Sequence, residues 1–202
     1  MENISEHCYE VFKESILQYH IFDSVDTPLA NPYQEGTPDN MFFKKNWIDT
    51  IQWHLEDLIR HPAIECSYAL SVKRRIDDLN QRRTDIVELI DDHFQHIYRD
   101  TIPREGAMPN TESLGWALDR LSILAIKEFH VDVELYRTDA TTEHLKRCSM
   151  RRAVLDSQKN DLLLSINWLA EDIRQGRRIN KVYKQLKMYN DPSLNPVLYT
   201  KK

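Results

Sequence analysis

The sequence has few of the residues that mark cysteine-based sites or β-sheets. Its 202 residues include only three cysteines, Cys8, Cys66 and Cys148, which are far apart and form no Cys-x-x-Cys pair. This spacing argues against a zinc ribbon, a redox dithiol and a disulfide framework. The chain also has only 4 glycines against 8 prolines, and no long stretch alternates apolar and polar residues as strands do. These absences favour an all-α fold.

The chain also lacks a net positive charge and long apolar runs. The formal net charge is -5 at pH 7, whereas a protein that binds nucleic acid generally presents a basic surface. No apolar run is long enough to span a bilayer, and the acidic, amphipathic start MENISEHCYEVF is unlike a secretory signal peptide. We therefore expect no nucleic-acid partner, no membrane span and a cytoplasmic location.

Common catalytic motifs are absent as well. A ferritin-like di-metal centre needs Glu-x-x-His pairs on two helices, and the chain has none. The acidic pattern of magnesium-dependent helical pyrophosphatases is represented only by Glu88-x-x-Asp91 and the pair Glu56-Asp57. There is no adjacent His-Asp pair, no glycine-rich phosphate loop and no Gly-x-Ser-x-Gly. His93 and His96 have the spacing of metal ligands, but they lie at an acidic, exposed-looking helix end. We therefore predict no metal site and no required cofactor.

Long helical periods account for most of the chain. Apolar residues recur at alternating three- and four-residue intervals, as expected of helices that pack in a bundle. We predict a single helical domain over residues 1–202, folded as a mostly antiparallel bundle of five to six helices. The predicted helices cover about 4–22, 46–60, 66–97, 114–136, 141–175 and 176–190.

Two segments lie outside this regular pattern. Residues 23–45 form a long loop with three prolines, and a loop of this length in a compact domain is usually a lid, a strap or a disordered segment. We interpret it as a strap that crosses between distant helix ends, with a lid over Trp53 as the alternative. The C-terminal helix and tail, residues 176–202, are basic, because seven Lys and Arg residues face one acid there.

A polar stripe on the helix over 46–60 is the first functional clue. At about 100° per residue, Asn46, Thr50, Trp53, Asp57 and Arg60 share one side, opposite the apolar side. A tryptophan centred on a polar face needs an explanation, because a large aromatic ring is seldom left in water. Asp57 and Arg60 are three residues apart, so they can pair on that face. The stripe is either covered by another segment of the chain or forms the wall of a ligand site.

The helix over 66–97 carries a matching stripe. Arg83 occupies a place in its apolar series where an apolar residue is expected. A buried arginine is costly unless a carboxylate or a bound anion meets it. Asp57 and Asp119 are the candidate partners, and the alternative is that Arg83 extends from the edge of the stripe into water. Beside the series run Lys73, Asp77, Asn80, Thr84 and Asp91.

The helix over 114–136 is apolar nearly all round, which is typical of a helix in the middle of a fold. Its polar residues must therefore be paired, bind a ligand or shift their pKa. Cations could hold a phosphate or carboxylate, acids could bind hydroxyls or act as a base, and tryptophan could stack on a sugar or base. The same residues could instead form a structural polar network. The candidate ligand-binding residues are Trp53, Asp57, Arg60, Lys73, Asp77, Asn80, Arg83, Asp119 and Lys127.

Four motifs between Asn46 and Tyr199 resemble those of a family of bacterial proteins of unknown function and similar length. They are N-W-x5-W-x2-E-D-x2-R, V-K-R-R-I-D-D-L-N-Q-R-R-x-D, L-D-R-L-S-I-L-A-I-K and K-V-Y-K-Q-L-K-M-Y-N-D-P-S-L-N-P. The resemblance implies a genomic setting, since members are often encoded beside glycosyltransferases and other surface-polysaccharide genes, particularly in Bacteroidetes and Proteobacteria. It implies no activity, because none is established for the family.

Two functional hypotheses follow. In the first, the protein is a cytoplasmic accessory protein of cell-surface glycan biosynthesis that binds an anionic small molecule, such as a nucleotide sugar or sugar phosphate, between the helices that carry Trp53, Asp77 and Asp119. In the second, it is an interaction or scaffold module that docks a protein partner through its C-terminal helix and exposed surface, and the polar stripe is purely structural. Whether the protein is an enzyme is left open by both hypotheses.

Overall fold

The computed structural model describes residues 3–188 and 191–200, and over these residues it contains helices and loops without a strand. This confirms the predicted all-α class and the five to six helices. The helices are α1 (Ile4–Tyr19), α2 (Pro38–Ile59), α3 (Cys66–Ile97), α4 (Leu114–Leu135), α5 (Thr142–Arg174) and the single turn α6 (Pro196–Tyr199). No helix in the described ranges is both long and apolar enough to cross a membrane.

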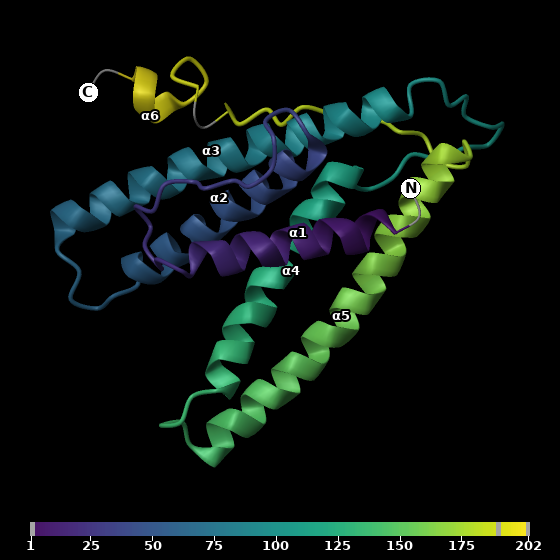
Figure 1. The fold of residues 1–202 in the computed structure, drawn as a ribbon. Coiled ribbons are helices and arrows are strands. Elements are labelled where there is room, and N and C mark those ends of the chain that lie inside the picture. The colour runs from purple at the N-terminus through teal and green to yellow at the C-terminus, as the bar shows by residue number, and fades with distance from the viewer. Residues whose placement is uncertain (1–2, 189–190, 201–202) are drawn as a thin grey trace.

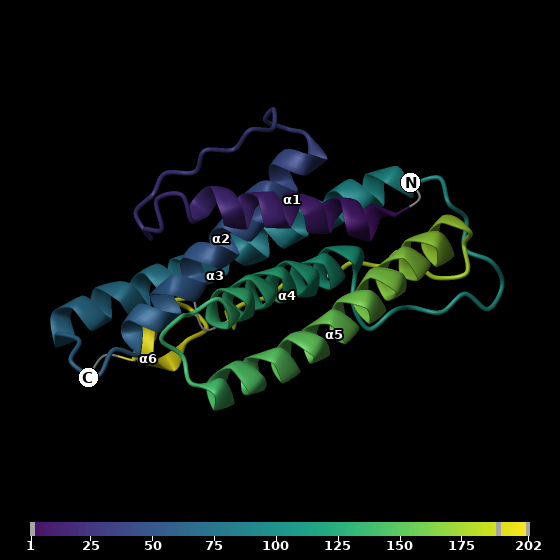
Figure 2. The same ribbon diagram turned by 60° about the horizontal axis from the view of Figure 1, so that its bottom comes forward.

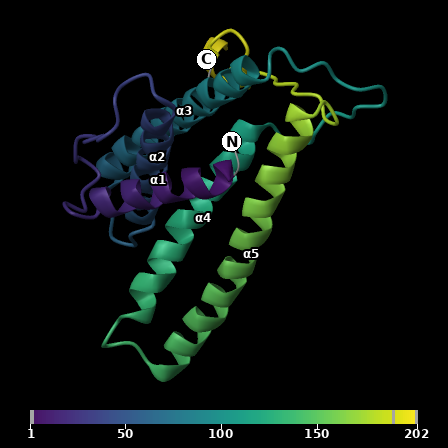
Figure 3. The same cartoon turned by 45° about the vertical axis from the view of Figure 1, so that its right-hand side comes forward.

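The five long helices form two antiparallel pairs and one crossing helix (Figure 1). α2 pairs with α3, and α4 pairs with α5, so that each pair is a helical hairpin. α1 lies across the hairpins and packs on α2, α4 and α5. Figure 3 shows α4 and α5 side by side along their length, with α5 at the edge of the molecule. Helices α2, α3 and α4 meet in the centre of the molecule, because α4 packs against both α2 and α3.

Side-chain caps fix where the long helices begin. The hydroxyls of Thr37, Ser113 and Thr141, and the Glu65 carboxylate, each accept a hydrogen bond from the backbone N–H three residues ahead. Such caps satisfy N–H groups that have no partner inside the helix. The predicted end of the loop over 23–45 was wrong, because the loop stops at Thr37, where α2 is capped. The sequence Thr37-Pro38-Asp39 is polar but is a helix start, with a capping hydroxyl, a proline at the first position and an acid in the first turn.

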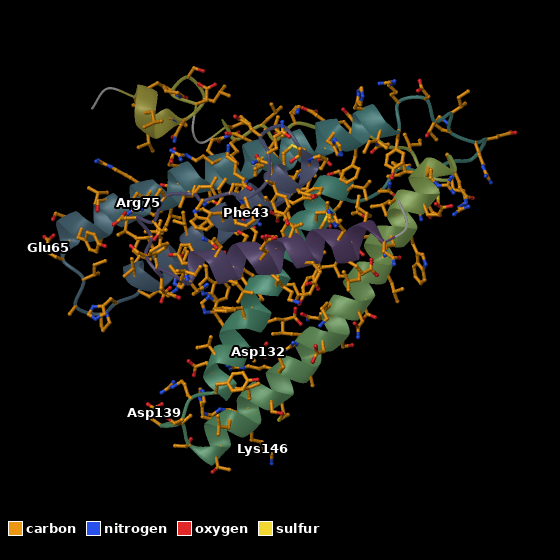
Figure 4. The ribbon with its side chains drawn as sticks, in the orientation of Figure 1. Phe43, Glu65, Arg75, Asp132, Asp139 and Lys146 are labelled. Carbon is orange, nitrogen blue, oxygen red and sulfur yellow. The ribbon has the colours of Figure 1, made fainter. Side chains whose placement is uncertain are left out.

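The main core lies where α1 crosses the other helices. α1 contributes six buried hydrophobic residues along one side: Ile4, Cys8, Val11, Phe12, Ile16 and Tyr19. They pack with Phe43 and Trp47 of α2 and with apolar residues of α3, α4 and α5. Figure 4 shows Phe43 at this crossing. A smaller apolar cluster joins the remaining halves of α2 and α3 through Leu55, Val72 and Ile76.

The far end of the α4–α5 hairpin extends beyond this core and is held by charged contacts. Arg152 of α5 reaches Asp132 of α4 with an Nε–Oδ1 distance of 2.7 Å, and Glu128 with an Nη1–Oε1 distance of 2.8 Å. Asp132, Asp139 and Lys146 in Figure 4 mark the course of this end. Few buried apolar residues lie there, so ion pairs carry more of the contact between the two helices.

The loop between α1 and α2 runs from the end of α1 back to the start of α2, which agrees with the interpretation as a strap (Figure 2). Arg75 of α3 holds it, because its guanidinium donates to the Val25 carbonyl oxygen at 2.8 Å and pairs with Asp26 at 2.9 Å. Loop residues Val25 to Leu29 border a cavity of about 780 Å³ between the strap, α2 and α3. Trp53 does not line that cavity. The loop is therefore not placed as a lid over Trp53.

The predicted helix over 176–190 was wrong for the described residues 179–187, which form no helix. This stretch instead runs along α3 (Figure 1). Lys184 pairs with Asp92 at 3.0 Å, the Gln185 N–H donates to Glu88 at 2.8 Å, and Lys187 donates to the Asn80 carbonyl at 2.7 Å. The expected apolar inner face is not formed either, since Tyr183 and Leu186 are exposed. The acids and carbonyls of α3 bind this stretch in a non-helical form. Residues 189 and 190 lie outside the described residues.

We predict that Gly115→Ala destabilises the protein. An added Cβ would meet Asp91 Oδ1 at 2.6 Å and the Val87 carbonyl oxygen at 2.8 Å, so α4 would have to move away from α3. Overpacking of this kind typically costs about 1–3 kcal/mol. We expect this cost to exceed the stabilisation that Ala ordinarily gives over Gly inside a helix. The free energy of unfolding in urea measures the effect. Ser149→Ala, at an exposed position of α5, is the control and should be nearly neutral. Equal stability of Gly115→Ala and wild type would contradict the close approach.

Candidate functional site

Four charged residues form a buried network at the meeting point of α2, α3 and α4. Lys45 and Asp49 of α2 pair with each other, and both side chains have an exposed fraction of 0%. Lys45 Nζ also lies 2.9 Å from Asp119 Oδ1 of α4. Arg83 of α3 binds Asp119 through two parallel N–H groups, with an Nε–Oδ1 distance of 2.7 Å. Two cations thus meet two carboxylates, as burial of charge requires.

Neutral hydrogen bonds complete this network. Ser122 of α4 donates its hydroxyl to Asp49 Oδ2 at 2.6 Å, and Asn46 donates its amide to Ser122 Oγ at 3.0 Å. Thr50 donates to the Asn46 carbonyl oxygen at 2.9 Å. Asp49 Oδ1 is buried and accepts no hydrogen bond from the described residues, and its neighbour at 3.5 Å is Arg83 Nε. The second oxygen of Asp49 is therefore held by charge alone.

The two carboxylates have opposite pKa shifts. Burial raises the pKa of Asp49, an effect that Lys45 only partly offsets. Burial also acts to raise the pKa of Asp119, but Lys45 and the Arg83 guanidinium outweigh it and hold the pKa below its ordinary value. Asp119 is thus the firmly ionised member, and Asp49 is the member that takes up a proton more readily.

Arg83 of α3 and Ile123 of α4 each line two cavities. One, of about 340 Å³, lies toward α2 and is lined by Asp49, Gln52, Trp53, Glu56, Asp57, Arg60, Arg83 and Ile123. The other, of about 680 Å³, lies toward α5 and includes Arg83, Trp116, Asp119, Ile123, Lys127 and Asp161 in its lining. We call the two cavities together the Arg83 groove. The Arg83 side chain has an exposed fraction of 27%, so its guanidinium reaches the groove from a buried anchor.

Six of the nine candidate residues line the Arg83 groove: Trp53, Asp57, Arg60, Arg83, Asp119 and Lys127. The other three lie elsewhere. Lys73 and Asp77 are exposed and pair with each other on α3. Asn80 accepts a hydrogen bond from Gln52 at 3.0 Å and thereby joins α3 to α2. The structure thus brings the tryptophan, Arg83 and Asp119 together but places the Lys73–Asp77 pair outside.

Two suggested pairings have a clear outcome. Of the two candidate partners for Arg83, the structure selects Asp119. The suggested Asp57–Arg60 pair does not form, because Arg60 pairs with Glu56 one turn away while Asp57 is exposed. Sequence reasoning also missed Lys45 and Asp49. Their four-residue spacing next to the polar stripe was the available signal, but on a helix this spacing usually marks an exposed pair.

Sequence reasoning also missed a cluster of three histidines that contacts Trp53. Ring nitrogens of His20, His54 and His130 all lie within 4.8 Å of one another, and the Nε2 atoms of His20 and His54 are 3.2 Å apart. The Trp53 ring stacks on the His130 ring at a centroid distance of 5.0 Å. Burial, followed by the charge of the two other histidines, lowers the pKa of His130 to about 4. Burial likewise lowers the pKa of His54. His54 and His130 therefore take up a proton less readily than a free histidine does.

A comparison with protein-family models matches residues 39–182 to the family described as Protein of unknown function (DUF4254). The chain belongs to this family. All nine candidate residues and the Lys45–Asp49–Arg83–Asp119 network fall within the matched region, whereas His20 falls before it. Searches of curated proteins and of solved structures found no match.

We predict that Asp119→Asn strongly destabilises this DUF4254 protein. The substitution leaves Lys45 and Arg83 without their shared carboxylate, and breaking a buried ion pair from one side typically costs about 3–5 kcal/mol. Urea unfolding at pH 7 measures the loss. The control is Asp77→Asn, which removes an exposed carboxylate paired along the same helix and should cost less than about 1 kcal/mol. A similar loss in both variants would contradict a special role of the buried network.

We further predict that acid removes the advantage of wild type over Asp119→Asn. The folded-state pKa of Asp119 lies below the ordinary value of 3.8. The folded protein therefore holds fewer protons than the unfolded chain between these two pKa values, and the stabilisation is present above pH 3.8 and is lost as the pH falls through the folded-state pKa. Urea unfolding of both proteins between pH 7 and pH 3 should give a constant difference down to about pH 5 and a shrinking difference below pH 4. A difference that stays constant to pH 3 would contradict an ionised Asp119.

Proposed function

We propose that this protein binds an anionic sugar derivative, such as a nucleotide sugar or a sugar phosphate, in the Arg83 groove. The observation that carries the proposal is the position of Arg83. Asp119 fixes the guanidinium from the buried side, while the same guanidinium lines both cavities. An arginine held in this way loses little conformational freedom when it binds a phosphate.

The rest of the groove suits a ligand that is part anion and part polyol. Arg83 uses two N–H groups for Asp119, and its remaining donors are available for phosphate oxygens. Lys127 is exposed on the same wall and makes no ion pair with a described residue. Trp53 and Trp116 supply apolar ring surface for a sugar or base, and exposed Asp57 and Asp161 can accept hydrogen bonds from hydroxyls.

The cellular setting of the proposal comes from sequence. The four motifs resemble bacterial proteins that are often encoded beside glycosyltransferase and surface-polysaccharide genes, and such pathways use nucleotide sugars as donors. We therefore propose a cytoplasmic accessory role in cell-surface glycan biosynthesis. The phosphate of the ligand would lie at Arg83, and its sugar or base would lie against Trp53 in the smaller cavity or against Trp116, near Lys127, in the larger one.

We predict that a phosphate-bearing ligand raises the melting temperature of the protein. A panel of inorganic phosphate, glucose 1-phosphate, uridine diphosphate and UDP-glucose tests this, because a ligand that prefers the folded state adds about 2.7 kcal/mol at 100 times its Kd. Lys127→Ala should weaken binding roughly tenfold, as the loss of one charged contact does. Lys44→Ala is the matched control, since Lys44 is also exposed but lines the cavity under the strap. No shift in wild type, or equal shifts in both variants, would contradict the proposal.

The scaffold hypothesis has one observation in its favour. The outer side of α5, at the edge of the molecule in Figure 3, exposes Met150, Val154, Leu164 and Trp168, which lie within one face of that helix. The C-terminal helix once expected to dock a partner does not form over residues 179–187. A pure scaffold would give no response to the ligand panel, so the melting experiment separates the two hypotheses.

A further inference from the structure

The end of α1, the loop that follows it and the C-terminal parts of α2 and α4 bring four metal-binding side chains to one place. His20 is the C-cap residue of α1, His54 lies on α2 and His130 on α4. Asp23 follows α1 at the beginning of the strap, and its Oδ1 lies 3.8 Å from His20 Nε2 and 3.9 Å from His54 Nε2. We propose that His20, His54, His130 and Asp23 form a binding site for a divalent transition-metal ion, with zinc as the ion that fits best.

The distances suit a four-coordinate ion. Zinc binds histidine nitrogen at 2.0–2.1 Å and carboxylate oxygen at about 2.0–2.2 Å in tetrahedral sites, so neighbouring ligand atoms lie about 3.3 Å apart. The His20 and His54 Nε2 atoms are already 3.2 Å apart. The three histidine ligand atoms lie within 4.8 Å of one another, and Asp23 Oδ1 lies 3.8 Å and 3.9 Å from two of them. Side-chain rotations toward a common centre would close these separations. Three imidazoles and one carboxylate are a donor set that suits zinc and excludes magnesium and calcium, which prefer oxygen.

Surrounding contacts orient the rings as they do in metal sites. His20 Nδ1 lies 2.7 Å from the Ile16 carbonyl oxygen, to which it can only donate, so the lone pair is on Nε2. This is the usual way in which a metal-bound histidine is fixed, through a hydrogen bond from its other nitrogen. The Tyr19 ring stacks on His54 at 5.1 Å and the Trp53 ring stacks on His130 at 5.0 Å.

Asp23 has a backbone conformation that fits this role. Its φ is +48°, in the left-handed region that residues other than glycine rarely adopt. Its N–H donates to the Tyr19 carbonyl oxygen at 3.0 Å, and this bond turns the chain so that the carboxylate lies over His20 and His54. The side chain has an exposed fraction of 63%, so an ion can reach the site from solvent.

A hydrogen-bonded histidine cluster without an ion is the simpler alternative. His54 could donate from Nε2 to His20 Nε2, which would account for their 3.2 Å contact. That arrangement leaves His130 Nε2 buried with no hydrogen-bond partner in the described part of the chain, and it gives Asp23 no reason to face the cluster. A bound ion accounts for all four residues at once, and it would tie α1, α2, α4 and the strap together.

Metal binding by the full chain tests this proposal. Protein stripped with a chelator is titrated with Zn²⁺ alone, with Co²⁺ as a spectroscopic substitute and with Mg²⁺ as the oxygen-preferring comparison. We expect one Zn²⁺ per chain, a higher melting temperature with Zn²⁺, visible absorption typical of four-coordinate Co²⁺, and no response to Mg²⁺. His54→Gln should weaken Zn²⁺ binding by more than the roughly 10–100-fold that loss of a supporting contact costs.

Two further variants keep the test decisive if His54→Gln folds poorly. Asp23→Asn changes an exposed side chain and should fold normally, weaken Zn²⁺ binding about tenfold and alter the Co²⁺ spectrum. The double variant His93→Gln/His96→Gln removes the histidine pair near the end of α3 and should bind Zn²⁺ like wild type. The proposal is overturned if wild type binds no stoichiometric Zn²⁺, or if the double variant loses binding while Asp23→Asn and His54→Gln keep it. A Co²⁺ spectrum unchanged in Asp23→Asn overturns the fourth ligand.

Discussion

The arrangement of the central helices depends on the ion pairs of the buried Lys45 ammonium group. This group lies between the carboxylates of Asp49 on its own helix and Asp119 on α4, and Arg83 of α3 completes the set. Charges removed from water are tolerated only when each meets its partners with good geometry. A shift of any one helix along another would leave a charge unpaired. The network therefore selects one register for α2, α3 and α4, which apolar packing alone would specify less strictly.

This constraint also gives the groove its chemical character. Because Asp119 is held by Lys45, it can orient Arg83 from behind, and Arg83 can then present donors to two cavities at once. The sequence suggested that a structural network and a ligand site were alternatives. The same residues can in fact serve both. One side of the same guanidinium is buried and the other faces solvent. Trp53 has a similar double position, since it lines the groove and stacks on the histidine cluster.

Much of the fold could be predicted because the buried side of a helix is evident from apolar residues that are close together in the sequence. The buried side of α1 and the end of α5 just before Gly176 follow from local patterns. The site could be predicted only in part. Arg83 and Asp119 stood out as charges in apolar surroundings, but Lys45 and Asp49 resembled an ordinary surface pair. His20, His54 and His130 are separated by 34 and 76 residues, and only the crossing of α1 over α2 and α4 brings them together.

The non-helical stretch along α3 has a consequence for the order in which the molecule is completed during translation. Lys187 contacts the Asn80 carbonyl across 107 positions of the chain, and Gln185 contacts Glu88 across 97. The ribosome releases this stretch only after both hairpins have been synthesised. Until then the acids on that side of α3 remain in water, and the closing contacts form late because they join such distant parts of the chain. The nascent protein therefore carries an unfinished acidic surface that a later stretch of the chain, residues 184–187, covers.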